Sequence, residues 1–195
     1  MGNSQPYEIL TGVGTLYVAA VSTTFPALTA TPNASWTDLG ETEGGVTVTL
    51  SQTTVRLRTD QHTGPVKAIR TEEDLLIETQ LAESTLENMA KLHGMAVTDT
   101  PAAAGVIGTR ALATHRGFTL DEYAFLFRGA SQSAYGDYPA QYEVPRGYFD
   151  GPIALAHKKD DKVVIPVQFV ALEDPNAGSE DDRFGRLIMQ DAAAI

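Results

Sequence analysis

The chain has 195 residues, of which 43% are hydrophobic and 20% are charged, and it contains no cysteine. This length fits one domain with its own core, and the lack of cysteine excludes disulfide scaffolds, thiol nucleophiles and Cys-ligated metal sites. A formal net charge of −11 opposes binding to nucleic acid through phosphates, because that binding requires clustered Lys and Arg. We therefore expect a single domain over residues 1–195, with an N-terminal strand and arm at 1–35 and an acidic C-terminal arm at 173–195.

The N-terminal segment carries strand signals and lacks Lys and Arg up to residue 35. Residues Tyr7–Val21 have apolar side chains at both parities, which indicates a strand buried on both faces, and residues 22–35 contain two prolines typical of a loop. The clean apolar run Tyr17–Val21 is far shorter than the ~20 residues that cross a bilayer. We therefore expect neither a signal peptide nor a membrane span.

A long β-hairpin is the clearest element of the sequence. Its outgoing strand is Val46–Arg58, its turn-rich tip is 60–65, and its returning strand lies within 66–83. A change in apolar parity within residues 51–54 predicts a bulge, or a strand that passes from one packed environment to another. The hairpin is long enough to extend beyond a single sheet. The apolar positions on either side of the change are Val46, Val48 and Leu50, then Val55 and Leu57.

One helix is predicted over Ser84–His93. Ser84 and Glu87 fit a capping box, with Ser84 as the N-cap, so Ser84→Ala is expected to cost ~1 kcal/mol. Gly94 is the natural end of this helix. The apolar stripe that would pack against a sheet consists of Leu86, Met89, Ala90 and His93.

The second half of the chain again favours strands. Residues 95–106 contain Pro101 and Gly105 and are predicted to form a loop. Seven or eight strands in all are predicted, which indicates a mainly β fold. The predicted strands after the helix are 107–118, 123–129, 142–149, 163–172 and 184–189.

Signals for catalysis or ligand binding are sparse. Gly12-Val13-Gly14 begins like a dinucleotide fingerprint, but Tyr17 stands where the third glycine belongs and no βαβ unit follows. No Gly-x-Ser-x-Gly elbow is present, and we expect no enzyme, no cofactor and no metal site. The histidines lie at no metal-ligand spacing from one another: His62, His93, His115 and His157.

Two alternatives remain open at this stage. Residues 174–182 fail the EF-hand pattern, because the glycine is one position early and Gly185 stands where the bidentate Glu belongs. A calcium loop of another kind is an alternative to a solvated acidic linker. Acids beside aromatics, such as Asp121 and Glu122, leave glycoside hydrolysis open as well.

The segment from Trp36 to Gly94 combines a Trp-x-x-Leu-Gly entry, a long hairpin and a capped helix. In this order, over about a third of the chain, it resembles the major tail tube proteins of long non-contractile-tailed phages. The second half offers no residue-by-residue match. The resemblance rests on Trp36-Thr37-Asp38-Leu39-Gly40, the Gly44-Gly45 step, Gly64-Pro65-Val66, Ile77-Glu78 and Leu81 through Asn88.

The resemblance implies a β-sandwich with one flanking α-helix and a long β-hairpin that contributes to an intersubunit β-barrel. It implies a structural virion protein that closes into hexameric rings, which stack into the tail tube and conduct the genome during ejection. The implied partners are further copies and other tail proteins (tape measure, terminator and distal tail), with genomic DNA passing through unbound. The implied locations are the virion tail and, during assembly, the host cytoplasm.

Two sets of site residues follow from this reading. An acidic or neutral bore repels DNA and keeps it mobile, so we expect Arg56 and Arg58 to pair with acids across strands. The tip, expected to contact the next ring, is Asp60, Gln61, His62, Thr63, Gly64 and Pro65. The candidate lumen acids are Glu41, Glu43, Glu72, Glu73, Asp74 and Glu78.

Two other functions compete with this one. The first is a β-sandwich carbohydrate-binding module of a surface apparatus, which would expose a row of aromatics. The second is the inner tube of a contractile injection system, whose architecture is the same. The aromatics of the first alternative are Tyr135, Tyr138, Tyr142 and Tyr148.

Overall fold

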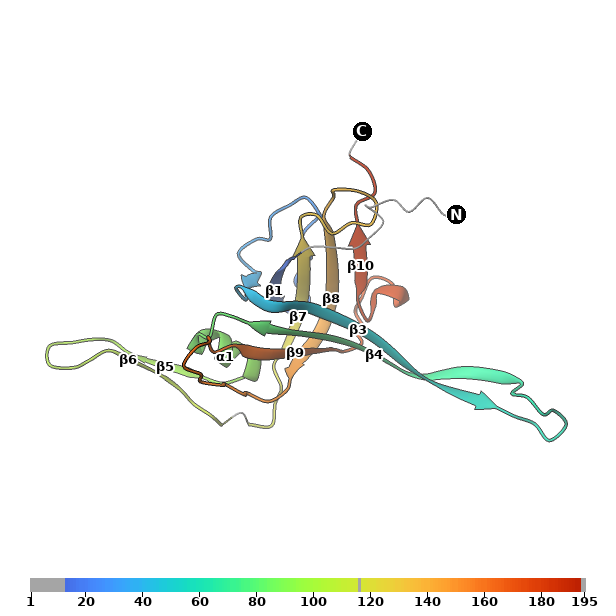
Figure 1. The fold of residues 1–195 in the computed structure, drawn as a ribbon, viewed down its shortest axis with the longest axis horizontal. Helices are drawn as coiled ribbons and strands as arrows, with labels where there is room; N and C mark the ends of the chain where they lie inside the picture. Colours follow the sequence, from blue (N-terminus) through green and yellow to red (C-terminus); the bar gives the residue numbers. More distant parts are fainter. Residues whose placement is uncertain (1–12, 116, 194–195) are drawn as a thin grey trace.

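A computed structural model describes residues 13–115 and 117–193 of the chain. The described residues form a mainly β fold with one α-helix, α1 (Leu86–His93), and one short 3-10 helix, η2 (Glu180–Asp182) (Figure 1). This confirms the predicted fold class. The strands are β1 (Thr15–Ala20), β2 (Thr37–Asp38), β3 (Thr42–Leu57), β4 (Lys67–Leu81), β5 (Val97–Thr100), β6 (Thr109–Leu112), β7 (Glu122–Gly129), β8 (Ala140–Asp150), β9 (Ile165–Ala171) and β10 (Arg186–Met189).

One antiparallel sheet folds over on itself to form two layers. Its strand order is β2-β1-β7-β8-β9-β4-β3, with β10 paired to β8. Figure 1 shows β1, β7, β8 and β10 running across the direction of β3, β4 and β9. Strand β8 joins the layers, because Ala140 to Glu143 pair with β10 whereas Gly147 to Asp150 pair with β9. The expected sandwich is therefore built from a single sheet.

The core lies between the two layers and contains the inward side chains of both. Alternate residues of a strand point to opposite faces, so the odd residues of β9 and those of β4 from Leu75 to Leu81 are buried while their even neighbours face outward. Phe125 on β7 stacks on Phe169 of β9 with ring centroids 4.7 Å apart, which ties the layers together. The fully buried members include Leu16, Val18, Ile77, Leu81, Val144 and Ile165.

The long hairpin is β3 and β4, and the predicted change of phase is confirmed. Thr53 pairs with Glu72 but Thr54 pairs with Arg70, so β4 carries one extra residue, Thr71. The Thr71 hydroxyl donates to the Thr53 carbonyl at 3.2 Å. Beyond this bulge, residues of β4 with a given parity point to the opposite face of the hairpin. The reversal occurs at the point where β3 changes its apolar parity. The apolar side chains of both strands therefore move together to the opposite face of the hairpin.

A second irregularity lies at the base of β3. Between the pairs Glu43–Gln80 and Thr47–Glu78, β3 has two more residues than β4. Gly44 and Gly45 have φ angles of 75° and 84°, a left-handed conformation that a residue with a Cβ rarely adopts. The Thr79 hydroxyl donates to the Gly45 carbonyl at 2.8 Å, which fixes the bulge to β4.

The helix α1 is present as predicted, but its N-cap is Thr85 and not Ser84. The Thr85 side chain accepts a hydrogen bond from the Asn88 backbone at 3.2 Å. Ser84 instead donates to the Val163 carbonyl at 2.6 Å, and so holds the segment before β9. The predicted end is confirmed, because Gly94 adopts the left-handed conformation and its N–H bonds to the Ala90 carbonyl. Met89 and Leu92 are the buried residues of the helix.

The corrected cap gives a testable prediction. Thr85→Ala is expected to lower the free energy of unfolding by about 1 kcal/mol, because the Asn88 N–H loses its partner at the helix terminus. Thr85→Ser keeps the hydroxyl and is expected to retain most of the stability. Urea unfolding of both variants and the parent measures the difference. Equal losses in the two variants would contradict the capping role.

Two segments differ from the sequence-based prediction. Residues 95–106, predicted as a loop, contain β5, which pairs with β6 to form a second hairpin outside the main sheet. Figure 1 shows this hairpin projecting from the body on the side opposite the β3–β4 tip. Strand β1 begins at Thr15, and residues 7–12 of the predicted N-terminal strand lie outside the described residues.

Candidate assembly surfaces

The predicted tip lies at the far end of the β3–β4 hairpin, away from the two-layered body (Figure 1). All six tip residues are exposed. The turn is closed locally: the His62 N–H donates to the Thr59 carbonyl at 3.2 Å, and Arg58 donates to the Thr63 carbonyl at 3.0 Å. The tip is therefore a formed structure that is free to contact another molecule.

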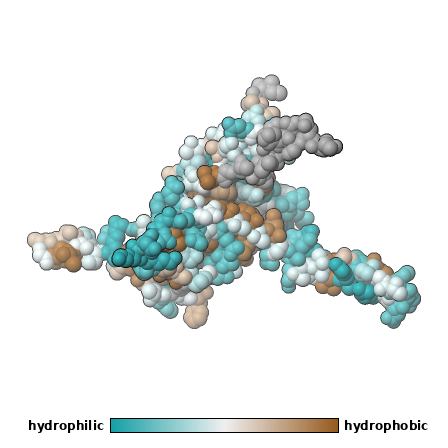
Figure 2. Space-filling view, in the orientation of Figure 1, coloured by the Kyte–Doolittle hydropathy of each residue, from teal (hydrophilic) through white to brown (hydrophobic). Residues whose placement is uncertain are grey.

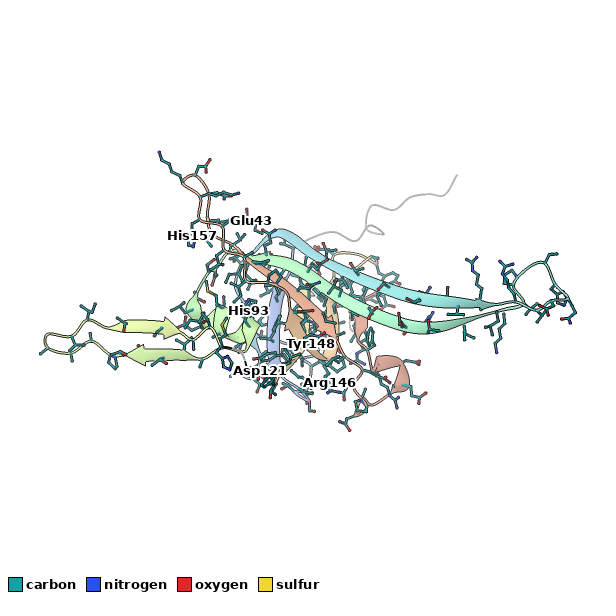
Figure 3. All side chains as sticks on the ribbon, turned by 90° about the horizontal axis from the view of Figure 1, so that it is seen from below. Glu43, His93, Asp121, Arg146, Tyr148 and His157 are labelled. Atoms are coloured by element: carbon teal, nitrogen blue, oxygen red, sulfur yellow. The ribbon has the colours of Figure 1, made fainter. Side chains whose placement is uncertain are left out.

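We define residues 54–71, with the tip, as the distal hairpin. All of its residues are exposed, and Figure 3 shows its side chains projecting from both sides of the ribbon. Of its charged residues, Asp60 is acidic and four are basic, in a chain whose net charge is −11. The hairpin is thus a basic projection from an acidic protein. The basic residues are Arg56, Arg58, Lys67 and Arg70.

The two faces of the distal hairpin differ in chemistry. Val55 pairs with Ile69 and Leu57 pairs with Lys67, so one face is apolar apart from Lys67. Arg56 pairs with Ala68 and Thr54 pairs with Arg70, so the other face is basic. We call the surface of Val55, Leu57 and Ile69 the distal apolar face. These three side chains are 42%, 43% and 39% exposed, respectively.

The expected ion pairs of Arg56 and Arg58 do not occur within the described part of the chain. Arg58 bonds to a backbone carbonyl of the tip, and the cross-strand neighbour of Arg56 is Ala68. Arg70 instead forms an ion pair with Glu73 and donates to the Gln52 side chain at 2.6 Å. The alternation of β3 and β4 explains this outcome, because it places Arg56 beside an alanine.

The candidate lumen acids lie along β3 and β4, but not on one face. Asp74 and Glu78 share the outward face of β4, opposite the core residues Leu75 and Ile77. Glu72 has the same parity as these two acids, so the alternation of the strand puts it on the same face as they are. Glu73 has the opposite parity and pairs with Arg70.

Two of the acids lie at the base of the hairpin. Glu41 is exposed, and its carbonyl accepts a hydrogen bond from the Ala82 N–H at 2.8 Å. Glu43 is half-buried and forms an ion pair with Lys162 at 2.5 Å. The hydrogen bond to Glu43 raises the pKa of Lys162, so this pair is neutral overall in ordinary buffers. Glu43 therefore adds less negative charge to its surroundings than Glu78 does.

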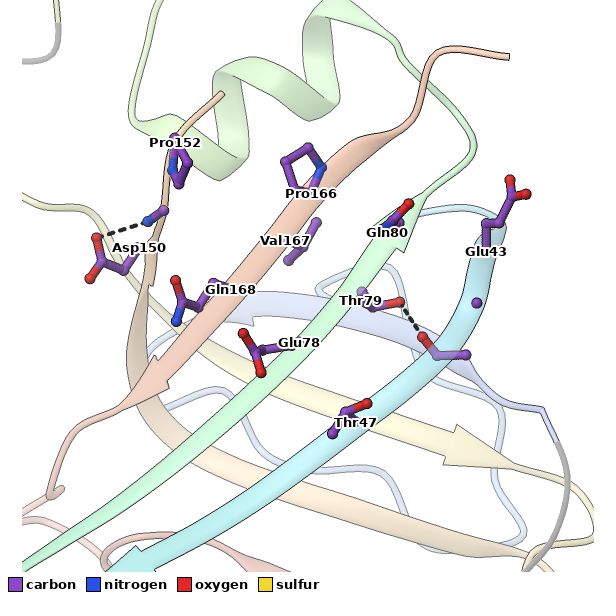
Figure 4. A pocket seen from close by; sticks show the side chains of 13 residues that line it. Glu43, Thr47, Glu78, Thr79, Gln80, Asp150, Pro152, Pro166, Val167 and Gln168 are labelled. Carbon is purple, nitrogen blue, oxygen red and sulfur yellow. Dashed lines mark hydrogen bonds between the residues drawn. The ribbon is translucent and has the colours of Figure 1, made fainter. Parts of the chain in front are cut away.

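The outward face of β9, β4 and β3 carries a polar depression of about 410 Å³ (Figure 4). Thr47, Glu78 and Gln168 form a cross-strand row on its floor, because Glu78 pairs with both of the other residues. Asp150 and Glu43 lie at its sides. The face is concave, polar and acidic, and it contains no Lys or Arg among its lining residues.

Strand β3 forms one edge of the sheet. It has 16 residues and pairs with β4 alone in the described structure. Strand β4 pairs with β9 from Leu76 to Leu81, so its distal part also has one side without a described strand partner. Long exposed edges of this kind are templates for pairing with another chain, and native proteins usually shield them.

The structure weakens the competing readings of the sequence. Of the four tyrosines, Tyr135 alone is exposed, while Tyr142 packs against the core and stacks on Phe127 at 6.2 Å. Asp174 is buried and accepts a hydrogen bond from the Asn176 N–H at 2.9 Å, so this side chain shapes the loop at 174–182. Within the described residues, no group of three or more His, Asp or Glu side chains is placed to hold a metal ion.

Comparison with known families gives a direct assignment. The family model described as phage tail tube protein matches residues 1–194, and the chain belongs to this family. It is therefore a structural protein of the bacteriophage virion, located in the tail. A comparison with curated proteins finds no relative that matches the chain. Of the described helices, none has the length and apolar character needed to cross a membrane.

Sequence reasoning missed one exposed surface. The loop between β5 and β6, residues 101–108, contains no charged residue. Val106 and Ile107 at this loop are 52% and 82% exposed. The sequence does contain a signal for this surface. Three alanines, followed by Val106 and Ile107, lie between two short strands that contain threonine. We call residues 101–108 the second-arm tip.

Proposed function

We propose that the chain, folded as a single tail-tube domain, closes into hexameric rings that stack into the tube through which the genome is ejected. The assignment to the tail tube family supports a tube. The observation that carries the ring is the edge strand β3, which has 16 residues and one strand partner. Pairing β3 of each subunit with the exposed side of the distal β4 of its neighbour would complete an intersubunit barrel and remove both edges.

The outward face of β9, β4 and β3 is the surface we propose to line the bore. It is concave and acidic, and Glu78 and Asp74 point away from the core of the subunit. Acids repeated along a tube repel the phosphates of DNA over ~8 Å at physiological salt, so the genome remains mobile. Glu41, Glu43, Glu72 and Glu73 are the remaining candidates, of which Glu43 and Glu73 have basic partners within the subunit.

The role we propose is structural and not catalytic. Other tail proteins, namely the tape measure, terminator and distal tail proteins, are the expected partners at the ends of the tube. Assembly would take place in the host cytoplasm before the tail joins the virion. An absence of hydrolytic activity toward glycans would agree with this role, and turnover of a glycan substrate would contradict it.

Electron microscopy of the purified protein tests the proposal. We expect negatively stained rings with sixfold symmetry, and tubes at higher protein concentration. Size-exclusion chromatography with light scattering gives the mass of the smallest assembly, for which a ring of six 20.9 kDa chains is expected. A protein that remains monomeric at all concentrations, without rings or tubes, would contradict the proposed assembly.

The tip gives a separate prediction about stacking. Deleting residues 61–64 should leave a folded protein that forms rings but no tubes, because the tip makes no described contact with the body of its own subunit. Thr98→Ser, a conservative change at an exposed position of β5 far from the tip, serves as the control and should form tubes normally. Electron micrographs of both variants decide the matter. Tubes of normal length from the deletion variant would show that the tip does not join rings.

A further inference from the structure

Two exposed apolar surfaces project from opposite sides of the body. The distal apolar face belongs to the β3–β4 hairpin, and the second-arm tip belongs to the β5–β6 hairpin (Figure 1). Figure 2 shows hydrophobic residues on both projections, with the body lying between them. Neither surface is covered within the described chain. Because the two lie at opposite ends, one subunit does not bring them together.

We propose that the second-arm tip of one subunit docks on the distal apolar face of a neighbouring copy of the same chain. This inference rests on the proposed assembly into rings. A ring of more than two subunits requires a heterologous contact, in which two different surfaces of the same chain meet. The two surfaces here are different, are both apolar, and point in opposite directions, as such a contact requires.

The charges agree with this pairing. The second-arm tip has no charged residue, so it brings no charge to Val55, Leu57 and Ile69, and Lys67 beside Leu57 is the charge of this face that has to stay in solvent. The distal hairpin has a formal net charge of +3, and the rest of the chain has one of −14. The arginines on the opposite face of the hairpin stay in solvent or meet acids of the neighbour.

The β5–β6 hairpin has the construction of a rigid arm. Its base is fixed to the helix, because Arg110 on β6 forms an ion pair with Glu87 on α1. Arg110 also lies 3.8 Å from Asp99 on β5, across the hairpin. At the far end, Ala103 and Val106 form an isolated bridge that closes the loop. A fixed base and a closed tip reduce the entropy lost when the arm binds.

Cysteine crosslinking tests the contact directly, since the chain contains no cysteine of its own. Ile107→Cys and Ile69→Cys are purified separately, mixed, assembled and mildly oxidised. We expect a crosslinked dimer that requires both variants, because a disulfide forms only where the two Cα atoms come within ~7 Å. The matched control replaces Ile69→Cys with Ala68→Cys, on the opposite face of the hairpin, and should lose the crosslinked band.

A second variant tests the contribution of the contact to assembly. Ile107→Asp places a charge on the second-arm tip, far from the core. We expect this variant to unfold like the parent protein but to form no rings. Thr98→Asp adds the same charge on the exposed side of β5 and should assemble normally. A crosslink within the Ile107→Cys sample alone would mean that tips meet tips, which overturns the inference.

The two proposals fail in different ways. The docking contact would be overturned if the parent forms tubes, the Ile107→Cys and Ile69→Cys variants do not crosslink, and Ile107→Asp forms normal tubes. The proposed tube would remain in that case. A parent protein that forms neither rings nor tubes would contradict the proposed assembly itself. In that case the mixed variants, oxidised in solution, still show whether the two surfaces meet, and absence of the heterodimer overturns the contact.

Discussion

Phe169→Ala is expected to lower the free energy of unfolding by about 3–5 kcal/mol. The Phe169 side chain has no exposed surface. Its ring stacks on Phe125 of the other layer at 4.7 Å and meets the edge of Phe149 at 5.2 Å. Truncation leaves a cavity where the two layers of the single sheet are held together. Because domains of this kind are stable by only ~5–15 kcal/mol, the loss is a large share of the total.

Urea unfolding followed by tryptophan fluorescence measures this loss. Trp36 is the single tryptophan of the chain, is buried, and packs in a smaller cluster with Ala19, Ala124 and Leu126, so it reports on unfolding away from the substitution. Phe118→Ala is the control, because the Phe118 side chain is 108% exposed. It should change stability by less than ~0.5 kcal/mol. Similar losses in the two variants would mean that Phe169 does not join the layers.

The hairpin was predictable because its signals are local and repeated. Alternation in Val46, Val48 and Leu50 defines β3 up to the bulge, and the change of parity to Val55 marks the place where the hairpin leaves the body. Both effects come from the fixed two-residue period of a strand. The left-handed Gly94 is similarly local, because few other residues end a helix in that conformation at low cost.

The elements that were missed depend on contacts distant in sequence. Ser84 and Thr85 both carry a hydroxyl that can cap a helix, and Thr85 is the cap because the Ser84 hydroxyl donates to the Val163 carbonyl. The β5–β6 hairpin has strands of only four residues with little apolar alternation, so its pattern is no stronger than that of a loop. A single sequence therefore does not separate these cases.

The candidate site was predictable in position but not in detail. The tip and the acids of β4 lie in one hairpin, which the sequence indicated. Which face each acid of β4 occupies follows from its alternation with the buried Leu75 and Ile77, which puts Glu73 on the face opposite Asp74 and Glu78. The partners of Glu43 and Glu73 were missed because Lys162 is far away along the chain, and Arg70 lies beyond the bulge.

An ion pair between a buried carboxylate and a half-exposed arginine joins the C-terminal segment to the body and gives the second large prediction. Glu143 on β8 has a side chain only 3% exposed, and Arg186 on β10 donates to it at 2.7 Å. Arg186 also lies 3.4 Å from Asp182. Removing Arg186 leaves the Glu143 carboxylate buried without its cation, although the amide of Gln141 still donates to it. Arg186→Ala is therefore expected to destabilise the protein by about 3 kcal/mol.

A double variant separates the value of the pair from the cost of an unpaired charge. Glu143→Leu with Arg186→Leu removes both charges and replaces them with apolar side chains of comparable size. Such replacements are often neutral or stabilising, so the double variant should recover most of the stability that Arg186→Ala loses. The control Arg183→Ala removes the partner of Glu173, a carboxylate whose side chain is 66% exposed, and should cost less than ~1 kcal/mol. If the double variant were as unstable as Arg186→Ala, the loss would come from the packing of the Arg186 stem along β10, and not from the carboxylate left buried on β8.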